Sequence, residues 1–314
     1  MPTLPSFEEL LPKQTDPAKA AMREKLVGIL SSKGEILPSA NSPRGKLWRL
    51  VNSPGSSLEE CAEVIQLDTA LASRIFRIAN SGAYAAQAGN ISEAILCLGL
   101  KFVREQVFNA AVFKEYSGWV LPSEWDLFWL RNIFVARLCE RMSAAYGSTN
   151  GSEYLAGLVH DMGWLFLATY LPDEFTQMFG SGKTVAEAEQ EFLPFGHAQI
   201  SAAIAARTLL PPRAIHAILH HHDPLSATFA DQKEPNPQPN KLGVILKVCD
   251  NVADICQMDM FGRATVTIES LPQSPEVLWL NRFGNTHDFV TLAEEELAKS
   301  QDIFSVYFSN RKFQ

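Results

Sequence analysis

The sequence predicts an all-α protein, and three observations support this. Apolar residues recur at helical spacing along most of the 314 residues, and hydrophobic residues make up 46% of the chain. Alternating strand patterns are scarce, and ATVTIES at 264–270 is the one short strand candidate. We therefore expect a helical bundle whose core is large enough for one large domain or two modest ones.

The expected helices carry local start and stop signals. A serine at 56 or 57 can cap a helix over 57–67, which has glutamates in its first turn. Asp68 starts the next helix, which ends near Gly82, and Gly99 separates a helix over 91–98 from one over 101–116. The other expected helices follow apolar periodicity alone: 17–31, 125–146, 153–170, 184–193, 197–209, 212–222, 241–258 and 284–299.

The chain is expected to have three parts. These are an N-terminal helical lobe over 1–118, a second helical lobe over 119–262 that carries the candidate site, and a helical extension over 263–314. Prolines and polar residues over 227–240 predict an exposed loop within the second lobe.

Composition excludes several function classes. The net charge of −8 disfavours nucleic-acid binding, which usually requires a basic domain or stripe. The start MPTLPSFEELLPKQ has no basic region before a long apolar run, so we expect no signal peptide, and we expect no membrane span. Five cysteines without C-x-x-C spacing indicate free buried thiols and a reducing, cytoplasmic compartment.

The first chemical candidate is the pair His160-Asp161 in GLVHDMGWLFL. The segment predicts a very hydrophobic helix, and buried charge is costly unless it is paired or bound to metal. Adjacent residues on a helix point in different directions, although their different reach still permits a shared metal. Taken alone, this dipeptide is more often a chance occurrence than a ligand pair.

Further polar residues follow on three later helices. His197 heads an alanine-rich helix, where a surface histidine is the simpler interpretation. His220, His221 and His222 end another helix, where they either interact with the helix C-terminus or ligate metal. Asp250 lies in the apolar segment ILKVCDNVADI and could instead bond to a backbone amide. Together, the ordered series of imidazoles and carboxylates suits a divalent metal that polarises a phosphoryl oxygen and activates a water.

The series and its surroundings resemble the HDOD family, the HD-related output domains. The segments DTALASRIFRIANSGAY at 68–84 and ISEAILCLGLKFVRE at 91–105 are similar in residue pattern to two successive helical segments of that family. FWLRNIFVARLCERM, YLAGLVHDMGWLFL and RTLLPPRAIHAILHHHDPL resemble its later helices in the same order. The resemblance covers roughly 45–258 and implies an HD-domain-like helical bundle with an N-terminal helical lobe.

The resemblance implies a ligand set and one departure from it. The implied metal ligands are His160, Asp161, His197, His221, His222 and Asp250. HD enzymes have a further histidine on the preceding helix, where this chain has Arg131, which cannot ligate a metal because it stays protonated. Arg131 could instead contact phosphate, as could His220, or it could pair with Asp161. The Gly-Tyr-Pro extension of cyclic-di-GMP phosphodiesterases is also absent, because Pro224-Leu225 follows Asp223.

Two functions therefore stay open. The resemblance and the departure at Arg131 favour a bacterial signal-transduction module without catalysis, which acts through a signalling partner, a phosphorylated small molecule or an oligomer. The alternative is a metal-dependent phosphohydrolase of a nucleotide or cyclic dinucleotide. In it, His160, Asp161 and Asp250 hold one metal, and the other three histidines hold a second metal or contact phosphate. The sequence does not distinguish Fe, Mn, Mg, Zn and Ni.

Overall fold

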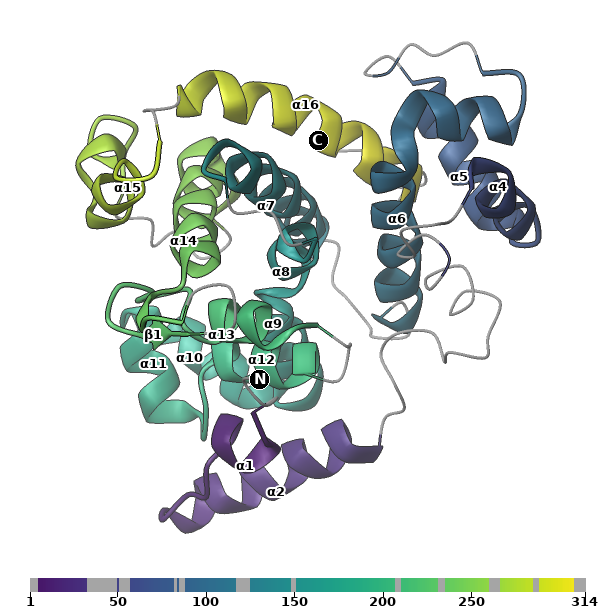
Figure 1. Cartoon of the computed structure of the whole chain (residues 1–314). Coiled ribbons are helices and arrows are strands. Elements are labelled where there is room, and N and C mark those ends of the chain that lie inside the picture. Colours follow the sequence, from purple (N-terminus) through teal and green to yellow (C-terminus); the bar gives the residue numbers. More distant parts are fainter. Residues whose placement is uncertain are drawn as a thin grey trace. The chain divides into compact units, whose positions relative to one another are not determined.

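The structure, a computed structural model, confirms the all-α prediction (Figure 1). It describes residues 5–32, 50, 57–81, 84, 88–116, 125–147, 151–206, 210–230, 235–259, 266–284 and 288–307. Among these residues the only sheet is a two-stranded antiparallel pair of β1 (Thr228–Phe229) and β2 (Gln238–Pro239). No described helix is long and apolar enough to cross a membrane.

The chain divides into two compact units. The site unit comprises residues 1–34 and 121–294, and the small unit comprises residues 35–120 and 295–314. The change of unit at 121 lies near the predicted lobe boundary at 118, whereas the first 34 residues group with the site unit rather than with the N-terminal lobe. The predicted domain limits at 118 and 262 stay a prediction, because a compact unit need not fold on its own.

In the small unit, three helices pack against one another in pairs: α4 (Leu58–Gln66), α5 (Thr69–Ala79) and α6 (Ile91–Tyr116). Ser57 and Asp68 cap α4 and α5 as predicted, and the Glu60 side chain closes a capping box with Ser57. Gly99 interrupts α6 with φ +81°, a conformation that favours glycine. Fully buried Ile65, Leu71 and other apolar residues of all three helices form one core.

The site unit contains the longer run of helices. They are α1 (Phe7–Leu10), α2 (Pro17–Ser32), α7 (Asp126–Ala145), α8 (Glu153–Val159), α9 (Met162–Tyr170), α10 (Pro172–Gly180), α11 (Val185–Phe192), α12 (His197–Ala206), α13 (Pro212–Leu219), α14 (Lys241–Ala253) and α15 (Pro275–Leu280). Helix α7 packs against α8 and α14, and α12 packs against α9 and α13. The inner helices α7, α8, α9, α12 and α14 are buried over most of their lengths, so their polar residues meet in the interior.

Several element predictions need correction. The described part of the strand candidate, 266–270, forms coil and a turn, in which Thr267 N–H donates to Ser270 Oγ at 2.8 Å. The helix predicted to run to 258 ends as α14 at Ala253 and continues as a π-helical turn, η2 (Asp254–Met258), with Gln257 at φ +60°. The terminal helix α16 (Phe289–Tyr307) starts and ends later than predicted. Gly82 lies outside the described residues.

Helices α7 and α8 approach closely because residue 157 is glycine. A Cβ built there would lie 2.5 Å from Ala136 Cα and 2.8 Å from its backbone nitrogen. Backbone atoms cannot move aside as the end of a flexible side chain can, so the two helices would have to separate.

Gly157→Ala is therefore expected to lower the free energy of unfolding by about 1–3 kcal/mol or more, as overpacked cores do. Urea unfolding would measure this loss. Gly180→Ala is the matched control, because a Cβ at Gly180 meets nothing within 4 Å. Equal stability of the two variants would contradict the close packing of α7 on α8.

Candidate functional site

The pair His160-Asp161 lies between two helices, not inside one. The predicted helix over 153–170 is broken: α8 ends at Val159 and α9 begins at Met162. Asp161 has φ −105° and ψ 6°, outside the helical range. His160 Nδ1–H donates to the carbonyl oxygen of Gly157 at 2.7 Å, which satisfies one of the free carbonyls at the end of α8. At this break the two side chains meet, with His160 Nε2 3.2 Å from Asp161 Oδ2.

The His160 imidazole is held between two carboxylates. Its Nε2 lies 3.2 Å from Asp161 Oδ2 and 3.3 Å from Asp250 Oδ1, and the ring is fully buried. Burial lowers the pKa of His160, but Asp161 and Asp250 outweigh burial and raise the pKa to about 10. Burial likewise raises the pKa of Asp161, but its contacts with His160, His197 and His221 hold that pKa well below its usual value. His160 is therefore a cation at neutral pH in the metal-free protein.

Arg131 occupies the interior of the same site. Its Nη2–H donates to Asp250 Oδ1 at 2.5 Å, and its Nη1 lies 2.6 Å from Asp254 Oδ1 and donates to the carbonyl oxygen of Met258 at 3.0 Å. Its Nε lies 3.9 Å from Asp161 Oδ2. The predicted pairing with Asp161 is thus the longest of the three ion pairs, and Asp250 and Asp254 are the main partners.

The charge of Arg131 sets the ionisation of its neighbours. Burial raises the pKa of Asp250, but Arg131 outweighs it and holds that pKa well below its usual value. Asp254 is more exposed and also faces Asp250; there burial and the like charge exceed the effect of Arg131, so the pKa rises to about 6. The guanidinium thus keeps the Asp250 carboxylate ionised without a metal ion.

His197 is buried, so the simpler interpretation of it as a surface histidine is wrong. Its ring stacks on Trp164 with centroids 4.0 Å apart and planes at 17°. Its Nδ1–H donates to Glu189 Oε1 at 2.5 Å, and its Nε2 lies 3.4 Å from Asp161 Oδ1. Burial lowers the pKa of His197, but Glu189 and Asp161 outweigh it and raise the pKa to about 9.

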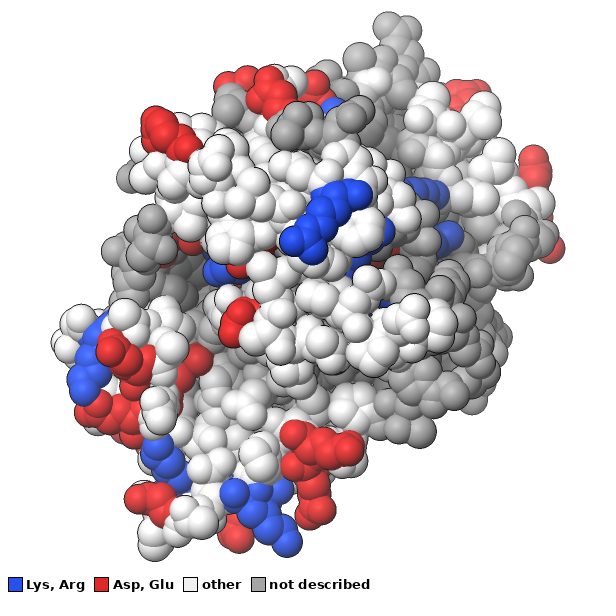
Figure 2. Space-filling model, turned by 60° about the vertical axis from the view of Figure 1, so that its left-hand side comes forward, with Lys and Arg blue, Asp and Glu red and all other residues white. Residues whose placement is uncertain are grey.

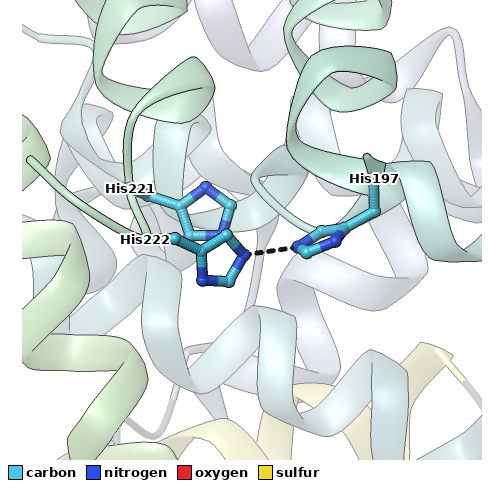
Figure 3. A group of neighbouring side chains, drawn as sticks. All are labelled: His197, His221 and His222. Atoms are coloured by element: carbon cyan, nitrogen blue, oxygen red, sulfur yellow. Dashed lines mark hydrogen bonds between the residues drawn. The ribbon is translucent and has the colours of Figure 1, made fainter. Parts of the chain in front are cut away.

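The rings of His197, His221 and His222 converge, as Figure 3 shows. Asp161 Oδ1 lies 3.4 Å from His197 Nε2 and 3.6 Å from His221 Nε2. The Nε2 atoms of His197 and His222 are 2.7 Å apart, so one ring donates to the other. His221 Nδ1–H donates to the carbonyl oxygen of Ile218 at 2.6 Å, which turns Nε2 into the site. Burial lowers the pKa of His221, so this Nε2 is a free lone pair.

Two sets of side chains have the geometry of metal ligands. The first set is His197, His221 and His222, and the second is His160, Asp161 and His221. Within each set, one ligand atom per residue lies within 4.8 Å of the others. The buried His221 Nε2 has no hydrogen-bond partner among the described residues, and Asp161 Oδ1 is 3.6 Å away. A buried acceptor without a partner is costly, and a metal ion would satisfy it.

Close packing of α9 on α12 positions the site. A Cβ at Gly163 would lie 2.1 Å from the carbonyl oxygen of His197, so only glycine lets α9 approach α12 this closely. Gly163 N–H also donates to Ser201 Oγ of α12 at 2.8 Å. The second glycine of the GLVHDMG segment thus brings Trp164 and Asp161 against His197.

The structure brings together seven of the eight predicted site residues, and His220 lies apart. The seven are Arg131, His160, Asp161, His197, His221, His222 and Asp250. The His220 ring packs against His216 with centroids 4.5 Å apart, on the other side of the helix end. Its predicted contact with a phosphate or ligand is untested, and no described contact joins it to the cluster.

Sequence reasoning missed Glu189 and Asp254. Asp254 follows Asp250 by four residues, so one helical turn places both carboxylates on the same side of α14, and this spacing could have identified it. Glu189 lies on α11 with other glutamates that the sequence indicates are exposed, and no sequence pattern distinguishes it from them.

A family model for the HDOD domain matches residues 37–224, more than half of the chain. The chain belongs to the HDOD domain family. The matched range includes Arg131 and the histidine cluster but ends before Asp250, which the structure places 2.5 Å from Arg131 and 3.3 Å from His160.

Solved structures share the HDOD fold of this chain at low sequence identity. An HDOD domain protein of unknown function from Geobacter sulfurreducens has TM-score 0.69 and 23% identity, with 91% of this chain and 98% of that chain covered. A protein provisionally named a phosphohydrolase, from Shewanella amazonensis SB2B, has TM-score 0.66 and 21% identity, with 90% and 97% covered. One provisionally named a signal transduction protein, from Marinobacter aquaeolei VT8, has TM-score 0.62 and 16% identity, with 95% and 68% covered.

A curated relative from Treponema pallidum (strain Nichols), named only as an uncharacterized protein, is 24% identical over 215 residues. The match covers 63% of this chain and 40% of that protein, so the chain spans less than half of its relative's length. At these identities the comparisons establish the HDOD fold and leave the chemistry to the residues of the site.

The raised pKa values of His160 and His197 predict how stability depends on pH. In the metal-free protein their pKa values of about 10 and 9 exceed the unfolded value of about 6.5, so their stabilisation is complete below pH 6.5 and is lost as pH rises through 9 and 10. The free energy of unfolding should fall between pH 7 and 10, by at most about 1.4 kcal/mol per pH unit for each histidine.

Urea unfolding of chelator-treated protein at several pH values would measure this slope, with His160→Gln expected to make it shallower. A stability that stays level or rises from pH 7 to 10 in the unsubstituted protein would contradict the assigned charges.

Proposed function

We propose that this HDOD protein is a regulatory module of bacterial signal transduction that acts by binding and not by hydrolysis. The single observation that carries the proposal is the position of Arg131. Its guanidinium pairs with Asp250 and Asp254 inside the site, where the family resemblance implies a metal-ligating histidine. A metal between Asp161 and Asp250 would have to displace this buried cation and the proton on His160.

Charge bookkeeping supports a stable metal-free state on this side of the site. Arg131 and protonated His160 are the cations here, and they face the carboxylates of Asp161, Asp250 and the more exposed Asp254. Breaking such a buried set by removing one partner usually costs 3–5 kcal/mol, which would oppose a metal that expels Arg131. The first metal position of an HD-type centre is therefore closed in this proposal.

The three-histidine cluster, by contrast, fits one divalent metal. His197, His221 and His222 would supply imidazole nitrogens and Asp161 a carboxylate oxygen, a donor set that suits borderline metals such as zinc, nickel or iron. Such an ion would supply Lewis acidity toward a phosphorylated ligand. The partnerless Nε2 of buried His221 supports this assignment.

A signalling module also needs a surface for its partner. On the face shown in Figure 2, acidic and basic side chains of the described residues are interspersed with uncharged surface. This mixed surface accords with the net charge of −8 and with a protein partner or a second copy of the chain as the binding target.

The second candidate is a metal-dependent phosphohydrolase. It is favoured by the convergence of His160, Asp161 and His221 as a further potential ligand set on the same carboxylate. Two ions sharing Asp161 would give the centre that phosphoester hydrolysis uses. This candidate requires Arg131 to leave its present partners.

Metal content and turnover distinguish the two candidates. We expect at most one metal ion per chain by elemental analysis after loading with zinc, manganese, iron or nickel, because Arg131 closes the position between Asp161 and Asp250. We expect hydrolysis of bis(p-nitrophenyl) phosphate and of cyclic dinucleotides to remain at the level of Asp161→Ala, which lacks the central carboxylate. Two ions per chain with turnover that Asp161→Ala abolishes would refute the regulatory proposal and establish the phosphohydrolase.

A further inference from the structure

Among the described residues, Glu189 is the acidic side chain that contacts His197 from outside the cluster. It lies on α11 and its Oε1 accepts two hydrogen bonds from His197, from Nδ1 at 2.5 Å and from the backbone nitrogen at 2.7 Å. The backbone bond satisfies one of the free N–H groups at the start of α12. The side-chain bond acts on the ring itself.

The bond to Nδ1 fixes which nitrogen of His197 faces the cluster. A carboxylate accepts and does not donate, so Nδ1 carries a proton. The opposite nitrogen, Nε2, then lies 2.7 Å from His222 Nε2 and 3.4 Å from Asp161 Oδ1. Stacking on Trp164 fixes the plane of the ring, and the contact with Glu189 fixes its rotation within that plane.

The fold makes room for this carboxylate at Gly196. A Cβ there would lie 2.6 Å from Glu189 Oε2, and Gly196 has no left-handed φ that would exclude alanine. Glu189 thus occupies the space that any other residue at 196 would fill. Its other side borders a surface hollow of about 440 Å³ that is also lined by Gln14, Lys19 and Gln199.

We propose that Glu189 is the positioning residue of the three-histidine cluster, which holds the His197 ring so that Nε2 is presented to a divalent metal. The inference rests on the proposed metal site and adds an outer partner to it. Carboxylate–histidine–metal arrangements of this kind typically change metal affinity by 10–100-fold when the outer partner is removed. A merely structural role, capping α12, would change stability and leave metal affinity unaltered.

The test compares four variants of the full chain by zinc competition with a chromophoric chelator. Glu189→Ala removes both hydrogen bonds, and we expect a 10–100-fold loss of affinity. Gly196→Ala displaces the Glu189 carboxylate without removing it and should also lower the affinity for zinc. Glu189→Gln keeps an accepting oxygen and should recover most of the affinity. Glu191→Gln, an exposed residue of the same helix that pairs with Lys183, should bind zinc as the unsubstituted protein does.

A second readout separates this inference from the metal proposal. In the metal-free protein, ¹⁵N-edited NMR should show the His197 Nδ1 proton in a strong hydrogen bond, lost in Glu189→Ala and kept in Glu191→Gln. If the unsubstituted protein binds no zinc but this signal behaves as expected, the proposed metal site is refuted, and the role of Glu189 in positioning the His197 ring is supported.

Unchanged zinc affinity in Glu189→Ala, or an unchanged Nδ1 signal, would overturn the positioning role. Because Glu189 borders a hollow, water can enter its place and the variants are expected to fold, which circular dichroism would check.

Discussion

The interaction on which the site depends is the buried ion pair between Arg131 and Asp250. Asp161 and Asp250 are carboxylates in the interior, and such groups require a cation or several hydrogen bonds to remain ionised there. In an enzyme of the HD type metal ions would meet this need. Here Arg131 meets it, with protonated His160 as a second cation and Asp254 as a second acceptor for the guanidinium.

Because Arg131 takes the role of a metal ion, the site has two chemically different halves, one on each side of Asp161. On one side are Arg131, His160 and Asp250, which are already paired with one another. On the other side are the neutral imidazole of His221 and the rings of His197 and His222, whose nitrogens point toward one another. Charge already compensated by the protein disfavours an ion on the first side. On the other side, His221 Nε2 has no hydrogen-bond partner among the described residues, and His197 and His222 would bind an ion once His197 releases a proton. A binding role follows more directly from this asymmetry than a hydrolytic one.

The sequence predicted the helices and most of the site because each had a local signal. Ser57 and Asp68 mark helix starts by their chemistry, and the ordered histidines mark the inner helices. It did not predict the break at His160-Asp161, because the apolar pattern over 153–170 indicates one continuous helix although it contains the turn-forming residues Asp161 and Gly163. It could not predict Glu189 either, since the contact of α11 with His197 depends on the tertiary packing of α11, and no residue pattern marks it. The departure at Arg131 was visible in the sequence, but its partners Asp250 and Asp254 depend on the packing of α7 against α14.

The most direct test of this account is a crystal structure of the unsubstituted protein soaked with manganese and then with zinc, with anomalous diffraction recorded at each absorption edge. The account predicts no anomalous peak between Asp161 and Asp250, where the Arg131 guanidinium should remain, and a peak for zinc only among His197, His221 and His222. An ordered ion bound to His160, Asp161 and Asp250, with Arg131 turned away, would contradict the central claim that the protein supplies its own cation at this position.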